Sequence, residues 1–170
     1  MRTPLFDQHV ALGARIVDFH GWEMPIQYNS IVEEHNAVRT KAGIFDVSHM
    51  GRFRVAGKDR KPFLDHVLTI PVSKMIPGRC RYTLLLNRNG GVIDDLLVME
   101  DSERDENWLI VNAGNRDKDL GWLKQNVEAH AVTVEDCSAH EALIALQGPQ
   151  SAAIVQKALG HSAITTTMLY

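Results

Sequence analysis

Two adjacent aspartates, Asp94 and Asp95, lie within a run of apolar residues in the segment NRNGGVIDDLLVME, 87–100. A carboxylate between apolar neighbours loses hydration, so each acid needs a hydrogen-bonding or cationic partner to offset that cost. Successive side chains of a β-strand point to opposite faces, which separates the two acids. They therefore cannot form a dyad that shares one proton, because the carboxylates of such a dyad must converge on one point.

The residues alone leave two interpretations of the pair open. In the first, both acids lie at the mouth of a hairpin, where one accepts hydrogen bonds from turn N–H groups and the other faces water, because aspartate is a common turn acceptor. In the second, one acid has a chemical role and the other holds the structure.

Other motifs with a defined chemistry are absent from the sequence. The eight histidines form no H-E-x-x-H and none pairs with a cysteine at metal-ligand spacing, so we expect no metal site. No phosphate-binding glycine loop and no nucleophile elbow occurs. His49, in FDVSHMG, could act as a base, but a lone histidine beside a strand is more often a structural residue.

Composition narrows the class of protein. The chain of 170 residues is 45% hydrophobic and 23% charged, as in ordinary globular proteins, and its length fits one domain or a domain with a smaller insertion. A net charge of -3 without a basic patch predicts no nucleic-acid partner, and no apolar run is long enough to predict a membrane span. Cys80 and Cys137 lie far apart, which favours a reducing cytoplasm.

The elements that must position the acids begin with a hairpin. RYTLLL at 81–86 and GVIDDLLVM at 91–99 read as two strands, and the asparagines and glycines between them can adopt the positive φ of a tight turn. Upstream, Thr3 is predicted to cap a short helix that Gly13 ends, and Ser30 a helix that Gly43 ends. The segment 19–28 is predicted to be packed but irregular.

Strands and helices alternate from residue 44 onward. Apolar spacing predicts helices at 58–69 and 116–130, and strands at 44–47, 52–57, 107–112, 131–136 and 142–147. Between about 51 and 136 the order is strand, helix, three strands, helix, strand, which is similar to an elaborated split β-α-β, ferredoxin-like layer. We therefore predict an α+β fold in which 51–136 is an inserted subdomain and 1–50 plus 137–170 form a discontinuous first domain.

Six blocks of the sequence carry a family resemblance. In order they are RTPLFDQH, ARIVDFHGWEMPIQY, AVRTKAGIFDVSHMG, LNRNGGVIDDLLV, VNAGNRDKDLGWL and ALIALQGPQS. Through them the chain resembles the N-terminal part of the T-protein family, the aminomethyltransferases of the glycine cleavage system. The resemblance implies a T-protein-like, folate-binding fold and a cytoplasmic transferase of one-carbon metabolism and glycine catabolism. Its partners would be lipoylated H-protein, whose aminomethyl group supplies the one-carbon unit, and tetrahydrofolate, which accepts that unit as ammonia is released.

The resemblance also assigns roles to residues. It makes Asp95 the catalytic carboxylate, a role in which an anion steadies the positive charge that develops during transfer, most strongly in a low-dielectric setting among residues such as Ile93 and Leu97. Asp94, on the opposite face, would then be structural and bond backbone near the turn. Folate contacts carry over, besides Asp95 itself, to Met50, Tyr82, Ile110 and Asn112.

The end of the chain departs from the family. The resemblance covers less than half of a full-length member, so we expect an incomplete pocket and exposed apolar surface that favours homo-oligomers or partner chains. Residues 159–170, LGHSAITTTMLY, do not look like the family's continuation; they are similar to the final motif of tyrosine recombinases, in which His161 would precede Tyr170. The alternatives to a transferase fragment are a folate-binding or structural module without transfer activity and, remotely, a DNA-joining fragment.

Overall fold

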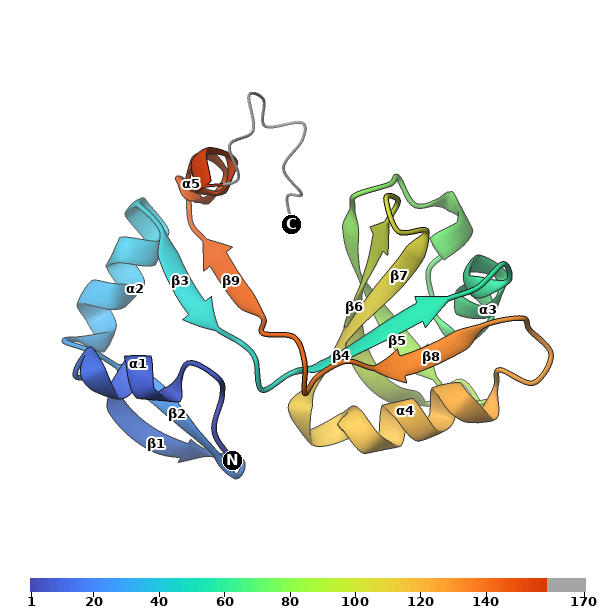
Figure 1. The fold of residues 1–170 in the computed structure, drawn as a ribbon, viewed down its shortest axis with the longest axis horizontal. Coiled ribbons are helices and arrows are strands. Elements are labelled where there is room, and N and C mark those ends of the chain that lie inside the picture. Colours follow the sequence, from blue (N-terminus) through green and yellow to red (C-terminus); the bar gives the residue numbers. More distant parts are fainter. Residues whose placement is uncertain (159–170) are drawn as a thin grey trace. The chain divides into compact units, whose positions relative to one another are not determined.

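The computed structural model describes residues 1–158 and divides them into two compact units (Figure 1). The first unit comprises Met1–His49 and the described residues from Ala142 onward, and the second comprises Met50–Glu141. The segment 159–170, for which the sequence predicts a likeness to tyrosine recombinases, lies outside the described residues.

The first unit is built from two small sheets and three helices. Its elements are α1 (Phe6–Ala11), β1 (Arg15–Phe19), β2 (Trp22–Gln27), α2 (Ile31–Thr40), β3 (Gly43–Asp46), β9 (Ile144–Gln147) and α5 (Ser151–Ala158). Strands β1 and β2 form an antiparallel hairpin, and β3 pairs antiparallel with β9, which comes about a hundred residues later in the chain. Ser30 caps α2 by accepting a hydrogen bond from the Glu33 N–H at 3.4 Å, which confirms its predicted role.

Two helix boundaries predicted in this unit are wrong. Helix α1 begins at Phe6, and Thr3 is not its cap, because the Thr3 side chain is buried and its carbonyl accepts a bond from the Phe6 N–H at 3.2 Å. Helix α2 ends at Thr40, whereas Gly43 opens the next strand. Both predicted boundaries differ from the observed ones by a few residues, because a cap-like residue near a helix end does not by itself fix where the helix begins or ends.

The segment 19–28 is not irregular, because it contains the turn and second strand of the β1–β2 hairpin. His20 and Gly21 adopt φ of 52° and 86°, so a two-residue turn of the kind that matches strand twist joins Phe19 to Trp22. Pro25 argued against a strand, but both strands of a two-stranded sheet are edges, where a missing N–H is tolerated.

The second unit is a five-stranded antiparallel sheet with two helices and two short 3-10 turns. Its elements are β4 (Gly51–Ala56), α3 (Arg60–Val67), η1 (Val72–Lys74), β5 (Cys80–Leu86), β6 (Val92–Asp101), β7 (Glu106–Val111), η2 (Ala113–Asn115), α4 (Arg116–Gln125) and β8 (Thr133–Asp136). The strand order is β5-β6-β7-β4-β8. The predicted order of strand, helix, three strands, helix, strand is confirmed, as is the α+β class, while the ferredoxin-like assignment of this layer stays a prediction.

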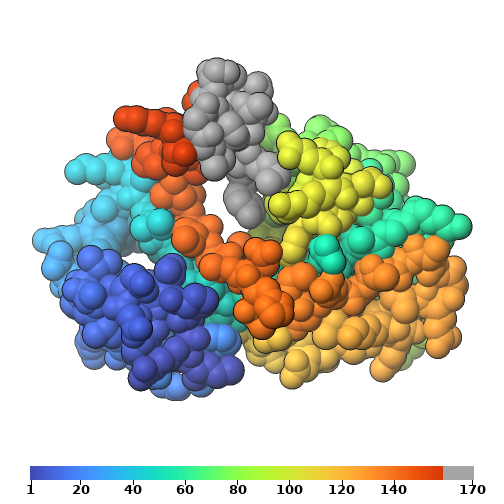
Figure 2. Space-filling view, viewed as in Figure 1, coloured from blue at the N-terminus to red at the C-terminus, as the bar shows by residue number. Residues whose placement is uncertain are grey.

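Both helices pack on one face of this sheet. Leu96 and Leu109, from β6 and β7, are buried in a single apolar cluster with Phe63 of α3 and Leu123 of α4. Helix α4 lies beside β8, to which the ion pair between Arg116 and Asp136 (2.6 Å) joins it, and both reach the molecular surface (Figures 1 and 2). The opposite face of β5 and β6 has no helix of this unit on it and exposes large side chains.

The predicted hairpin of β5 and β6 is confirmed. The Asn87 side-chain oxygen accepts hydrogen bonds from the N–H groups of Asn89 (2.9 Å) and Gly91 (3.0 Å), and Gly90 has φ of 79°. The turn is thus closed by an asparagine and a glycine, as the sequence predicts, and it fixes the register of the strand that carries the two aspartates.

Candidate active site

The register of the sheet brings predicted site residues together in a first row across the strands. Leu97 on β6 is paired with Tyr82 on β5 and with Ile110 on β7. Paired residues of an antiparallel sheet point to the same face, so these three side chains line the face opposite the helices. Tyr82 is 68% exposed, and Ile110, on the far side of Leu97, is buried.

The adjacent pair of residues on this face includes Asp95, which is paired with Leu84. Asn112 directly follows β7 and Met50 directly precedes β4, beyond the last pairs of those strands, Leu97–Ile110 and Gly51–Val111. Tyr82, Asp95 and Ile110 therefore lie on one face of the sheet, while Asn112 and Met50 lie at the adjoining strand ends.

The setting of Asp95 differs from the one expected. Its side chain is exposed rather than enclosed by apolar neighbours, so a low-dielectric environment is not provided by the described residues. Its contacts are with Asn112, whose Nδ2 donates to the Asp95 carbonyl at 3.0 Å and to its Oδ1 at 3.1 Å. The resemblance predicts that Asn112 and Asp95 both contact folate. In the structure, the Asn112 side chain bonds the Asp95 carboxylate.

Asp94 is buried and fully engaged by donors. Its Oδ2 accepts from the Asn112 N–H at 3.2 Å, and its Oδ1 accepts from the Nδ2 atoms of Asn112 at 3.0 Å and Asn115 at 2.5 Å. Burial alone would raise the pKa of Asp94, but these bonds and one from Asp119 hold that pKa below its usual range. The expectation that Asp94 bonds the hairpin turn is wrong, because Asn87 fills that role and Asp94 bonds the connection after β7.

Sequence reasoning missed Asp119, which faces Asp94 from α4. Its carboxyl group is completely buried, and within the described residues no N–H or hydroxyl donates to either of its oxygens. Burial, and next the adjacent Asp94, raise the pKa of Asp119 to about 8, although Lys118 opposes the shift. A signal was present, because Asp119 precedes Leu123 by one helical turn and so shares the apolar face of its helix.

Two of the four histidines in residues 1–49, His9 and His49, lie in well-defined side-chain environments. The ring of His49 packs edge-on against Phe19 and Trp22, at centroid distances of 5.8 and 6.3 Å. His9, which the sequence did not single out, is buried and bonds the Tyr28 hydroxyl at 2.7 Å and Asp46 at 3.1 Å through its two ring nitrogens. Both arrangements are typical of histidines that hold a structure together.

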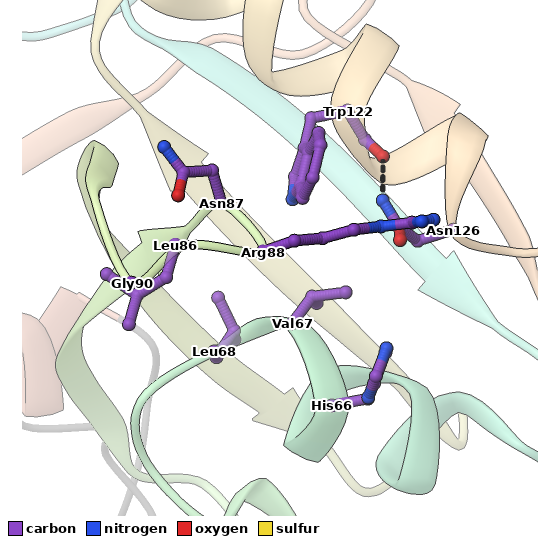
Figure 3. Close-up of a pocket in the computed structure, with 9 residues that line it drawn as sticks. All are labelled: His66, Val67, Leu68, Leu86, Asn87, Arg88, Gly90, Trp122 and Asn126. Carbon is purple, nitrogen blue, oxygen red and sulfur yellow. Dashed lines mark hydrogen bonds between the residues drawn. The ribbon is translucent and has the colours of Figure 1, made fainter.

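A hollow of about 320 Å³ lies near the β5–β6 turn and is lined by none of the five predicted site residues. In Figure 3, Arg88 extends beside Trp122 towards Asn126, whose Nδ2 donates to the Trp122 carbonyl at 2.8 Å. Its apolar floor comes from α3 and the end of β5, on the helix-covered side of the sheet. The candidate site is thus an open sheet face and not this hollow.

Within residues 1–158, no group of three or more histidine, cysteine, aspartate or glutamate side chains is arranged to hold a metal ion. Over the same residues, no helix has the length and apolar character that crossing a membrane requires.

Comparisons with known proteins found a matching family and similar proteins. The family described as GCVT N-terminal domain matches residues 5–169. An aminomethyltransferase of Geobacillus thermodenitrificans is 50% identical over 156 residues, which are 92% of this chain and 42% of that protein. The aminomethyltransferase of Bacillus subtilis is 46% identical over 155 residues, 91% of this chain and 42% of its own length.

A solved structure is similar over nearly the whole chain. The crystal structure of glycine cleavage system aminomethyltransferase T from Bartonella henselae superposes with a TM-score of 0.85 at 34% identity, and the match covers 96% of this chain and 44% of that one. The chain thus spans about two fifths of the length of the curated relatives that it matches.

Proposed function

Since the chain belongs to the GCVT N-terminal domain family, we propose that it forms the part of a T-protein that presents the catalytic carboxylate and one wall of the folate site. The reaction would move the one-carbon unit from the aminomethyl-dihydrolipoyl arm of H-protein to tetrahydrofolate, with release of ammonia, in the cytoplasm. The observation that supports this most is that Tyr82, Asp95 and Ile110 share one open sheet face and that Asn112 bonds Asp95.

The chemistry of this face suits such a substrate. An exposed aromatic ring and neighbouring apolar side chains can cover the flat face of a pterin, while polar groups at the edge satisfy its donors and acceptors. As ammonia leaves and a folate nitrogen attacks the electrophilic carbon, positive charge develops beside the sheet. The carboxylate of Asp95, held by Asn112, would stabilise that charge.

Because the Asp95 side chain is exposed to water, its carboxylate alone stabilises a positive charge only weakly. Two unit charges at 4 Å attract by about 1 kcal/mol in bulk water and about 4 kcal/mol at an effective dielectric constant of 20. The carboxylate therefore becomes effective when bound folate, H-protein or further protein excludes water from it. More than half of each curated relative lies outside the aligned region and could supply such cover.

A second candidate is a folate-binding or structural module of the same family without transfer activity. The exposure of both Asp95 and Tyr82 favours it, because an uncovered site binds more weakly and excludes no water. A folate-binding module would bind tetrahydrofolate without release of ammonia, and a structural module would do neither.

A transfer assay tests the enzymatic proposal. The chain is mixed with aminomethylated, lipoylated H-protein and tetrahydrofolate, with and without the remaining C-terminal length of the Bacillus subtilis relative, and ammonia is measured. We expect release that Asp95→Asn abolishes and that Asp18→Asn, an exposed strand aspartate of the first unit, leaves unchanged. If no ammonia is released even when the C-terminal part is added, transferase activity is contradicted, and the module without transfer activity remains as the candidate.

A further inference from the structure

A series of polar side chains leads from the core of the second unit to Asp95. Asn112 stands at its outer end, because its Nδ2 lies 3.0 Å from Asp94 Oδ1 and 3.1 Å from Asp95 Oδ1. A single amide group thereby links the carboxylates that strand alternation places on opposite faces. With its Nδ2 occupied in this way, Asn112 would meet a ligand through its carbonyl oxygen.

Asp94 is the middle member of the chain. It receives three bonds from Asn112 and Asn115, all of them from neutral donors. Because Asp94 is only 4% exposed, its negative charge depends on these donors and on the remaining neighbour, Asp119. Losing any one of them leaves a buried carboxylate short of a partner, which costs more than an average hydrogen bond.

Asp119 is the inner member and has to be a neutral acid. Two adjacent buried carboxylates cannot both be ionised at low cost, so a single proton is shared between them. Asp94 accepts from three amide donors as an anion, whereas no N–H donates to either oxygen of the fully buried Asp119, which leaves the proton on Asp119 and its hydroxyl free to donate to Asp94. The surroundings agree with this assignment, because Leu123, one turn further along α4, is fully buried and apolar.

We propose that Asp119 is a positioning residue for Asp95: its carboxylic acid donates to Asp94, which orients the amide of Asn112, which in turn holds the Asp95 carboxylate on the open sheet face. Any effect of Asp119 on catalysis rests on the proposed function of Asp95. The proposed hydrogen bonds among these side chains do not depend on that function. Loss of the Asp119 proton would put a second negative charge against Asp94 and loosen its hold on Asn112.

The titration of Asp119 depends on every charged group around it and its hydrogen-bonded neighbours. Asp94 and Asp95 face it from β6, and Lys118 lies beside Asp119 on α4, where its Nζ donates to the Ile93 carbonyl at 2.7 Å. Arg116 of the same helix is paired with Asp136 of β8. Burial and the adjacent Asp94 raise the pKa of Asp119 to about 8, so its charge changes near neutral pH.

Nuclear magnetic resonance of the Asn112 side-chain amide tests the proposed link between Asp119, Asp94 and Asn112 in the absence of folate. In the 170-residue protein we expect its signals to shift with a midpoint near pH 8. Asp119→Asn should abolish that shift, because the new amide still donates to Asp94 but does not titrate, while Asp117→Asn, an exposed neighbour on the same helix, should retain it. An Asn112 amide that does not respond between pH 6 and 10, or that still responds in Asp119→Asn, would overturn the proposal.

Calorimetry with tetrahydrofolate then tests the link to Asp95. We expect Asp119→Asn to bind within about threefold of the unsubstituted chain and Asp119→Ala about tenfold more weakly or worse, since one donor to a buried charge is lost. Circular dichroism establishes that each variant is folded. Equal binding by folded Asp119→Ala would overturn the positioning role, whereas an intact amide titration with no folate binding by any variant would contradict the proposed function instead.

Discussion

At the scale of residues, the two aspartates have different surroundings, one buried and one exposed, because strand alternation sends them to opposite faces. That separation was predictable from the sequence, since it needs only the period of a strand. The partners of Asp94 were not predictable, because Asn112 and Asn115 lie 18 and 21 residues further along the chain and reach it through a turn after the next strand. Asp119 was missed for the same reason, since only tertiary contact brings α4 against β6.

The buried acid pair predicts how stability depends on pH. The pKa of Asp119 is raised to about 8 in the folded chain, so the unfolded chain releases this proton at lower pH than the folded chain does. Its contribution to stability is therefore complete below the unfolded pKa, near 4, and is lost as pH rises through about 8. The free energy of unfolding should fall by at most ~1.4 kcal/mol per pH unit across that window.

Urea unfolding of the unsubstituted chain and of Asp119→Asn, compared at pH 5, 7 and 9, measures this effect. The difference between the two proteins isolates Asp119, because the lowered pKa values of Asp46, Asp94 and Asp136 act below about pH 4. Parallel stability curves for the two proteins from pH 5 to 9 would show that Asp119 keeps an ordinary pKa.

At the scale of elements, the hairpin and the helices of the second unit follow from local signals. The Asn87–Gly91 turn and the apolar spacing of α3 specify their own conformations, as the confirmed predictions show. The β1–β2 hairpin was mispredicted because Pro25 and Gly21 resemble loop punctuation when they stand in one short segment. Proline and glycine are tolerated in these strands because the sheet has two strands, so that both are edges. A sequence does not reveal how many strands a sheet contains.

A glycine beside β9 provides a test at this scale. Gly148 has φ of 108°, and an added Cβ would lie 2.5 Å from the Val38 carbonyl oxygen and 2.8 Å from that of Lys41. Gly148→Ala should therefore lower the free energy of unfolding of the first unit by at least about 1–2 kcal/mol. Gly121→Ala is the matched control, because it lies within α4 with nothing near the added atom and should stabilise by about 0.5–1 kcal/mol.

Denaturation midpoints of the two glycine variants, followed by circular dichroism, give the comparison. Equal midpoints for Gly148→Ala and the unsubstituted chain would show that the carbonyls of α2 do not constrain this turn.

At the scale of the whole molecule, we propose that the two compact units are the discontinuous first domain and the inserted subdomain that the sequence predicts. The main apolar cluster of the described residues lies entirely between Phe53 and Leu123, within the second unit. A fragment of residues 50–141 should therefore fold alone and unfold cooperatively on heating. A broad, non-cooperative transition of that fragment would mean that its fold depends on the first unit.

Self-association remains a prediction at this scale. The open face of the second unit exposes Tyr82 and Leu84, and apolar surface of this kind favours partner chains. Sedimentation velocity across a range of concentrations measures it: a mass that grows with concentration is expected, and a constant monomer mass would contradict homo-oligomers.

The most direct test of the central claim is calorimetry of tetrahydrofolate with the unsubstituted chain, Asp95→Asn and Asp18→Asn. We predict that the unsubstituted chain and Asp18→Asn bind with equal affinity and that Asp95→Asn binds about tenfold more weakly, because the charged acceptor at the edge of the folate site is lost. Identical affinity of all three proteins, or binding by none of them, would contradict the assignment of this sheet face as the folate site.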